Sequence, residues 1–248
     1  MLLVWIIVFS LLGSVLSVCG AALLIVFTKK VQKILVPSLI SYATGTLLGA
    51  ALIGMLPRAI EGTQQPHKIF MVLLFGIILF FILEKLVIWR HCHDHQCEIH
   101  AAAGPLILFG DAFHNLVDGV VITASFLISI PLGVATGLAV IAHEVPQEVG
   151  DLAILLESGY SRYKAILYNI LSSLTTLPGA IIAYIYLKEM LIIVPYILAL
   201  SASSFLYIAM SDLIPSLHRK LGIKTNILQF VLILAGIGTI ALLRLQHS

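Results

Sequence analysis

Histidines, carboxylates and amides gather in two short, otherwise apolar stretches of this chain. Seven of them are candidate metal ligands: His114, Asn115, Asp118, His143, Glu144, Gln147 and Glu148. Imidazole, carboxylate and amide donors suit Zn²⁺, Fe²⁺ or Mn²⁺, and neither stretch contains the Cys or Met that a soft metal such as Cu(I) prefers. The set exceeds the four ligands of a usual zinc site. We therefore expect two adjacent sites that share a carboxylate, or one site whose ligands change.

The spacing places each set on one face of a helix. Asp111, His114, Asn115 and Asp118 follow an i, i+3, i+4, i+7 pattern, and the second set, from His143 to Asp151, forms a similar stripe. Pro146 lies within this second stripe and cannot donate to the carbonyl of Ala142, so a local kink is expected. Gly119 and Gly150 border the stripes and would permit close helix approach or local unwinding. Asp111 and Asp151, at the flanks, are interpreted as gate or proton-relay groups, with a packing hydrogen bond as the alternative for each.

The elements that carry these stripes are predicted to be membrane helices. The chain has 248 residues, 60% of them hydrophobic and only 10% charged, whereas soluble domains have about 25% charged residues. Each carboxylate facing lipid at a helix centre would cost roughly 2.5–3.5 kcal/mol, so the five in the stripes must face each other, water or an ion. Eight apolar stretches are long enough to span a bilayer. They run near Leu2–Phe27, Pro37–Leu56, Phe70–Trp89, Gly104–Leu127, Leu132–Leu156, Ala165–Leu187, Ile192–Pro215 and Ile227–Leu243.

The distribution of basic residues predicts the topology. Of the fourteen Lys and Arg residues, ten fall in connections on one side of an eight-helix arrangement and four on the other. The positive-inside rule then places both termini outside the cytoplasm. The first stretch has no basic residue before its apolar run, so it is interpreted as a span and not as a secretory signal. We expect one polytopic domain, residues 1–248, in a cell (inner or plasma) membrane, with no soluble catalytic or nucleic-acid-binding domain.

The paired motifs resemble those of the ZIP (zinc- and iron-regulated transporter-like) family. They read His114-Asn115-x-x-Asp118-Gly119 on the fourth span and His143-Glu144-x-Pro146-x-Glu148-x-Gly150-Asp151 on the fifth. Weaker likeness extends to Glu84-Lys85, Ser41–Pro57, and Phe205–Ala209 followed by Asp212 and Pro215. The resemblance implies an eight-helix bundle, a metal site between the fourth and fifth spans, and uptake toward the cytoplasm. It assigns metal-ligand roles to His114, Asp118, His143 and Glu144 and an accessory role to Asn115. Many members have a His or Glu where this chain has Gln147, a weaker donor.

Three further features are less specific. The connection at residues 90–102, expected in the cytoplasm, is rich in His and would collect or sense metal, with an ordinary solvated loop as the equal alternative; its histidines are His91, His93, His95 and His100. Met55-Leu56-Pro57 and Leu213-Ile214-Pro215 form a weak internal echo, consistent with an inverted repeat of three-helix units around the central pair. The sixth span aligns Asn169, Ser172, Ser173 and Thr176 on one face, a pattern more typical of helix packing than of a pathway lining.

The predicted function is transport of divalent transition-metal ions, zinc first, with Fe²⁺, Mn²⁺ or Cd²⁺ as alternative substrates and no prosthetic group. Asp212 joins Asp111 and Asp151 as a candidate gate or relay, and a homodimer is an open expectation. An intramembrane metal hydrolase is the rival from another class, because His143-Glu144 begins like a zincin motif, but Gln147 stands where the second His is needed. A non-transporting metal sensor is the second rival. A sensor would not need ligands at mid-membrane depth.

Overall fold

The structure is a computed structural model that describes residues 1–89, 99–218 and 223–245. The described residues form helices joined by short connections and contain no β-strand, which confirms the all-α class. The elements in chain order are α1 (Leu2–Leu11), η1 (Leu12–Leu16), α2 (Ser17–Val26), α3 (Lys29–Gly49), η2 (Ala50–Met55), α4 (Leu56–Glu61), α5 (Pro66–Trp89), α6 (Ile99–Ile128), α7 (Ile130–Glu157), α8 (Arg162–Ser173), α9 (Thr176–Glu189), η3 (Leu191–Ile193), α10 (Val194–Ile208), η4 (Ala209–Leu213), α11 (Ile214–His218) and α12 (Ile223–Leu245).

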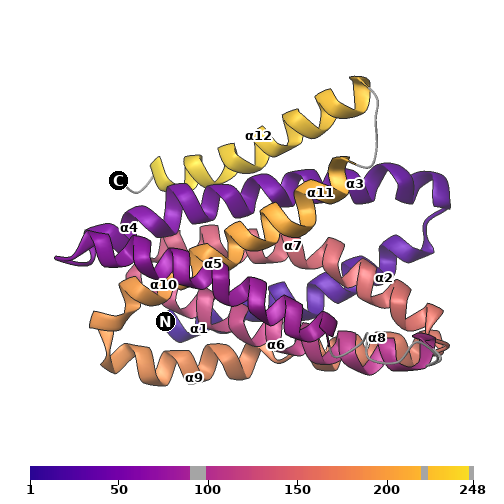
Figure 1. Ribbon diagram of the computed structural model, residues 1–248, viewed down its shortest axis with the longest axis horizontal. Coiled ribbons are helices and arrows are strands. Elements are labelled where there is room, and N and C mark those ends of the chain that lie inside the picture. The colour runs from indigo at the N-terminus through magenta and orange to yellow at the C-terminus, as the bar shows by residue number, and fades with distance from the viewer. Residues whose placement is uncertain (90–98, 219–222, 246–248) are drawn as a thin grey trace.

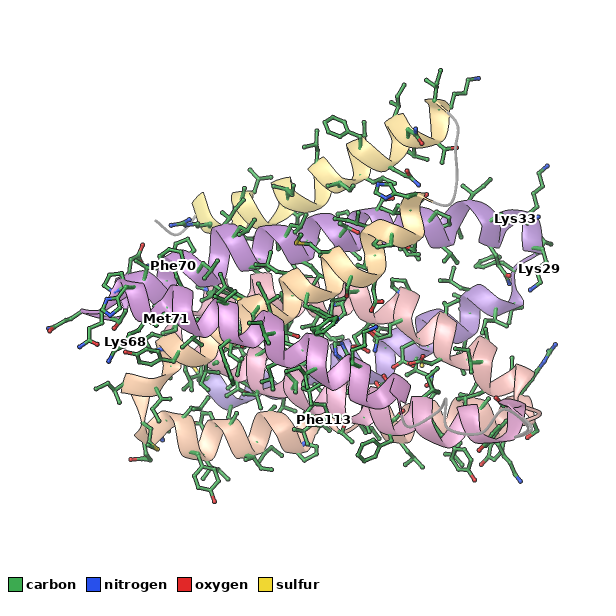
Figure 2. All side chains as sticks on the ribbon, in the orientation of Figure 1. Lys29, Lys33, Lys68, Phe70, Met71 and Phe113 are labelled. Atoms are coloured by element: carbon green, nitrogen blue, oxygen red, sulfur yellow. The ribbon has the colours of Figure 1, made fainter. Side chains whose placement is uncertain are left out.

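Joined end to end, these elements form the eight spans that the sequence predicted. Seven stretches of the described chain are long and apolar enough to cross a membrane. The eighth span is α7, whose 28 residues are sufficient in length but carry the second polar stripe. Large apolar side chains face outward, for example Phe70 (55% exposed) and Met71 (67% exposed) on α5, both labelled in Figure 2. Such an apolar exterior is typical of a surface that contacts lipid.

Several predicted boundaries were wrong for a common reason. The second span begins at Lys29, not at Pro37, and α3 continues through that proline. The fourth begins at Ile99, so the end of the expected loop at residues 90–102 is helical, while residues 90–98 lie outside the described residues. The length of an apolar stretch shows only the part of a helix in the bilayer core, whereas the helix extends into the polar interface, where charged residues are solvated.

The sixth span is divided between Ser173 and Thr176 into α8 and α9.

The helices run along the long axis of the bundle, with both chain ends at the same end (Figure 1). This arrangement agrees with an even number of spans. Lys29 and Lys33 lie at the opposite end of the molecule from Lys68 (Figure 2). The helices α6 and α7 contact each other along the bundle, and α9 and α8 also contact α6. The two polar stripes are therefore on adjacent central helices, as predicted.

The two similar segments, Met55–Pro57 and Leu213–Pro215, have the same local structure. Met55 ends the π-helical turn η2 before α4, and Leu213 ends the π-helical turn η4 before α11. In each case proline is the second residue of the following helix. A wide turn before proline accommodates the ring, which would otherwise clash with the preceding turn. The two spans run in opposite directions (Figure 1), as an inverted repeat requires.

Close approach of α6 and α9 depends on two glycines. A Cβ atom on Gly119 would lie 2.0 Å from the Thr176 carbonyl oxygen, and one on Gly179 would lie 2.1 Å from the Leu116 carbonyl oxygen. No side chain fits at either contact, so this glycine pair sets the helix separation. Gly119 therefore has the predicted packing role. A Cβ atom on Gly150 would meet no other atom within 4 Å. Of the two roles predicted for this glycine, close helix approach is therefore not the one found, and α7 continues as a helix through it.

Candidate metal centre

Four predicted ligands converge between α6 and α7. Suitable donor atoms of His114, Asp118, His143 and Glu144 all lie within 4.8 Å of one another. His114 is partly exposed, and the other three are buried. This group is called the mixed cluster below, because it combines two imidazoles with two carboxylates.

The donor separations in the mixed cluster match a tetrahedral metal site. The Nε2 atoms of His114 and His143 are 3.2 Å apart. His143 Nε2 lies 3.3 Å from Asp118 Oδ2, and His114 Nε2 lies 3.4 Å from Glu144 Oε1. The other two imidazole–carboxylate separations are 3.7 and 3.9 Å. Zinc–ligand bonds of about 2.0–2.1 Å place tetrahedral donors roughly 3.4 Å apart, so an ion fits with small side-chain movements.

Contacts around His143 orient its free nitrogen toward this space. Its Nδ1 lies 2.9 Å from the carbonyl oxygen of Ala139, one turn earlier on α7. A carbonyl only accepts hydrogen bonds, so Nδ1 carries the proton and the lone pair of the neutral ring is on Nε2. Phe205 of α10 packs edge to face on the ring, with centroids 5.7 Å apart. The sequence motif did not identify Phe205 as part of the site.

A second group of donors adjoins the first. Asp111, Glu144 and Glu148 are buried, and their carboxylate oxygens also lie within 4.8 Å of one another. This group is called the oxygen cluster below. Glu144 belongs to both clusters, which is the shared carboxylate that one sequence hypothesis required. Both oxygens of Glu144 and of Glu148 are buried without a hydrogen bond in the described chain.

The amides of Asn115 and Gln147 contact Asp111 and not the mixed cluster. Asn115 Nδ2 donates to Asp111 Oδ1 at 2.9 Å, and Gln147 Nε2 lies 3.5 Å from the same oxygen. Asn115 Oδ1 accepts a hydrogen bond from Thr176 Oγ1 at 2.9 Å. Asp111 Oδ2 is buried without a hydrogen-bond partner in the described chain. In this structure, both amides orient Asp111, and their role as ligands stays a prediction.

The site contains an excess of buried negative charge. Five carboxylates are buried on α6 and α7, namely Asp111, Asp118, Glu144, Glu148 and Asp151, whereas no Lys or Arg is buried among the described residues. Buried charges are normally paired or coordinate a metal. Two histidines alone do not balance five carboxylates. The arrangement therefore favours a cation, and one divalent ion would compensate two of the five negative charges.

The other predicted residues lie away from the two clusters. Asp151 is buried one turn beyond Glu148 on α7. Asp212 is exposed on η4. His91, His93 and His95 lie outside the described residues, and His100 falls at the start of α6. The gate, relay and loop-binding roles of these residues stay predictions.

The polar face of the sixth span contacts the site. The spacing of its residues had not shown whether this face serves helix packing or lines a pathway. Thr176 contacts Asn115, and Thr175 Oγ1 donates to the Ala112 carbonyl oxygen at 2.5 Å. Asn169 and Ser173 are fully buried, and their side-chain polar atoms have no hydrogen-bond partner within the described chain. The aligned pattern was the available signal. The packing role holds for Thr176, while Asn169 and Ser173 keep donor and acceptor capacity inside the bundle.

Comparison with known proteins identifies the family. The sequence model described as "ZIP Zinc transporter" matches residues 89–244, more than half of the chain. The chain belongs to the ZIP family. This match includes α6 and α7 with both clusters, so the family resemblance of the two motifs is confirmed.

Named members of the ZIP family cover different shares of the chain. Zinc transporter ZIP13 of Pongo abelii is 31% identical over 222 residues, which are 84% of this chain and 66% of that protein. Zinc transporter foi of Drosophila melanogaster is 36% identical over 154 residues, 61% of this chain and 21% of that protein. Zinc transporter ZIP10 of Danio rerio is 34% identical over 145 residues, 56% of this chain and 17% of that protein. The chain thus spans just under two thirds of the first relative and about a fifth of the other two.

Proposed function

We propose that this protein carries divalent transition-metal ions across a membrane, with zinc as the principal substrate. The observation that carries the proposal is the mixed cluster, in which His114, Asp118, His143 and Glu144 meet inside a bundle of membrane-length helices. Membership of a family described as zinc transporters supports the same function. It also favours a transporter over the hydrolase and the sensor.

The donor chemistry supports zinc first and leaves related ions as alternative substrates. Two imidazoles and two carboxylates at tetrahedral separations suit Zn²⁺, and the same donors also accept Fe²⁺ or Mn²⁺. The oxygen cluster offers only carboxylates, which bind harder ions relatively better. We propose that an ion occupies the mixed cluster first and then shares Glu144 with the oxygen cluster.

The direction of transport is proposed from the order of the polar groups. Along α6 and α7, ionisable side chains continue from the mixed cluster to Asp111, Glu148 and Asp151. This run covers roughly 10–12 Å of helix. It leads toward the end of the bundle that carries Lys29 and Lys33, which the positive-inside rule assigns to the cytoplasm. On the other side of the mixed cluster, residues 119–128 and 130–142 contain no ionisable side chain. We infer uptake toward the cytoplasm, with both termini outside.

Zinc uptake into proteoliposomes tests this function. The wild type, His143→Ala and Glu144→Ala are reconstituted with a zinc-sensitive dye inside the vesicles. His67→Ala serves as the control, because His67 is an exposed residue at the start of α5. We expect flux in the wild type and control, with at least a tenfold loss in the two cluster variants. Equal flux from all four proteins would refute the assignment of the site. Competition by Fe²⁺, Mn²⁺ and Cd²⁺ in the same assay measures selectivity.

A further inference from the structure

A groove opens between the beginnings of α3 and α12, far from the metal centre along the chain. Its volume is about 230 Å³, and its lining includes Lys33 and Ile34 from α3 and Lys224, Thr225 and Leu228 from α12. A cavity of about 15 Å³ by this measure holds one water molecule, so the groove accommodates a much larger group. Ile34 is 59% exposed and Leu228 is 46% exposed. The groove therefore has apolar walls that are open to the surroundings.

The groove results from the way in which α3 and α12 cross. A Cβ atom on Gly45 would lie 2.1 Å from the Ile233 carbonyl oxygen, and one on Gly236 would lie 2.4 Å from the Tyr42 carbonyl oxygen. The two backbones thus touch near these glycines. From this crossing, α12 rises away from α3 toward its own beginning (Figure 1). The helices diverge into a wedge with the groove inside it.

Two lysines reach the wide end of the wedge at the same level. Lys33 precedes Gly45 by twelve residues, and Lys224 precedes Gly236 by the same number. Both helices run in the same direction (Figure 1), so each lysine lies roughly 18 Å from the crossing. Figure 2 shows Lys33 near the beginning of α3. Lysine side chains near the ends of membrane helices extend toward the lipid headgroups. The described lining of the groove contains both lysines and no carboxylate.

We propose that this groove binds one anionic phospholipid. Lys33 and Lys224 pair with the headgroup phosphate, and the N–H groups in the first turn of α12 favour the same anion because they have no partner within their own helix. An acyl chain follows the apolar wall formed by Ile34 and Leu228. The lipid fills the wedge and holds α12, much of which is exposed, against α3. The proposal depends on the membrane setting and not on the metal centre.

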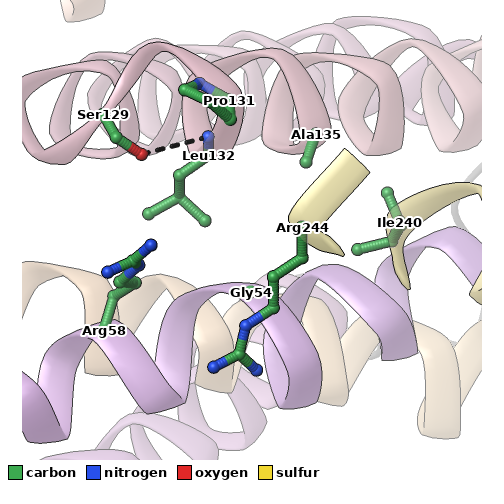
Figure 3. A pocket seen from close by; sticks show the side chains of 8 residues that line it. All are labelled: Gly54, Arg58, Ser129, Pro131, Leu132, Ala135, Ile240 and Arg244. Carbon is green, nitrogen blue, oxygen red and sulfur yellow. Dashed lines mark hydrogen bonds between the residues drawn. The ribbon is translucent and has the colours of Figure 1, made fainter. Parts of the chain in front are cut away.

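The opposite end of the same two spans has a different arrangement. There Arg58 and Arg244 border a cavity of only about 20 Å³ (Figure 3). Arg58 pairs with Glu61 at 3.2 Å, and Arg244 Nη1 donates to the Ile53 carbonyl oxygen at 2.7 Å. The space at this end has room for little more than a water molecule. Cationic residues alone do not produce a lipid site, so the size and lining of the groove distinguish it.

Native mass spectrometry of the full chain tests the proposal. The protein is purified in detergent and titrated with phosphatidylglycerol or phosphatidylcholine of identical acyl chains. We expect one phosphatidylglycerol to bind with a preference of at least roughly tenfold over phosphatidylcholine. Lys33→Gln with Lys224→Gln should weaken phosphatidylglycerol binding about 25-fold, fivefold for each lysine. The control, Lys29→Gln with Lys30→Gln, removes the same charge from exposed residues at the same end of α3 and should bind as the wild type does.

Two further arms separate a lipid from a simple phosphate ion. Leu228→Trp keeps both lysines but fills the apolar wall, so it should reduce lipid binding while thermal unfolding of the lipid-free protein stays unchanged. Glycerol phosphate, which lacks acyl chains, should not compete at equal concentration. The proposal is overturned if the wild type does not prefer the anionic lipid or if the groove and control pairs lose binding equally. Full competition by glycerol phosphate would also overturn it.

Discussion

Glu144 is the residue whose replacement tests the design of the metal centre most directly. It is fully buried, and its carboxylate contributes to both the mixed and the oxygen clusters. Glu144→Gln keeps the shape of the side chain but replaces a charged donor by a neutral amide. Both clusters lose a carboxylate at once. Glu148→Gln is the matched comparison, because Glu148 is equally buried, lies one turn away and belongs to the oxygen cluster alone.

The size of the effect follows from the four donors of the mixed cluster. Zinc sites with four protein ligands bind with about 10–16 kcal/mol, which is about 3 kcal/mol for each donor. Loss of one donor should therefore weaken zinc binding roughly 100-fold. At a free zinc concentration 1,000 times the wild-type Kd, zinc stabilises the wild type by about 4.1 kcal/mol and the variant by only about 1.4 kcal/mol. The metal-free variant should be at least as stable as the wild type, because one of five buried carboxylates is neutralised.

Calorimetric titration with zinc measures the loss of affinity. Thermal unfolding with and without zinc measures the stability of the metal-free protein and the stabilisation that zinc adds. If both clusters fill, the wild type binds two ions, Glu148→Gln retains the tighter one, and Glu144→Gln weakens both. A general folding defect would instead lower the stability of the metal-free protein. The assignment fails if Glu144→Gln binds zinc as the wild type does. It also fails if Glu148→Gln weakens the tighter ion as much as Glu144→Gln does.

Three other changes probe the same structure. Gln147→His replaces a weak donor by an imidazole beside Asp111 and should raise zinc affinity about tenfold by titration; an unchanged affinity would limit this position to orienting Asp111. Gly119→Ala should lower the free energy of unfolding by about 1–3 kcal/mol, because the new Cβ meets the Thr176 carbonyl. Gly110→Ala should not, because a Cβ atom there would meet no other atom within 4 Å. Equal melting temperatures of the two variants would contradict the packing role. Zinc affinity should fall as the pH is lowered, since both imidazoles bind zinc only when unprotonated. Affinity independent of pH would exclude histidine ligation.

The class of fold and the meeting of the His and carboxylate donors between α6 and α7 could be predicted because both depend on local patterns. Apolar length identifies a span, and the high energy of a carboxylate in lipid requires the stripes on α6 and α7 to face each other. The division of the donors into two clusters could not be predicted in the same way. Helical periodicity places Asn115 beside His114 and Asp118 on one face, but it does not determine which neighbour its amide contacts. That depends on the rotamer and on the approach of α9, which Gly119 and Gly179 permit.

Contacts that distant spans make with the site could not be predicted from local sequence patterns either. Thr176 reaches Asn115 because the sixth span is divided before Thr176, and Phe205 meets His143 because α10 packs near the centre of the bundle. Neither contact has a fixed spacing from the His and carboxylate motifs. The start of α3 at Lys29 could not be predicted from apolar length either. A membrane helix can continue beyond the apolar core, where water and lipid headgroups solvate its charged residues. Sequence reasoning is thus strongest where the membrane restricts the alternatives.

The two amides bear on how the proposed site would release an ion toward one side. Asn115 and Gln147 both contact one oxygen of Asp111, and the other oxygen has no hydrogen bond in the described chain. The oxygen cluster is therefore held in place before an ion arrives and needs no large rearrangement. An ion moving into it exchanges imidazoles for carboxylates, which zinc binds less selectively. In the proposed path Glu144 would remain a ligand throughout, so the ion would always have a charged partner. We infer that Asn115 and Gln147 assist transport by fixing the second, weaker position, and that their neutral amides allow the ion to leave.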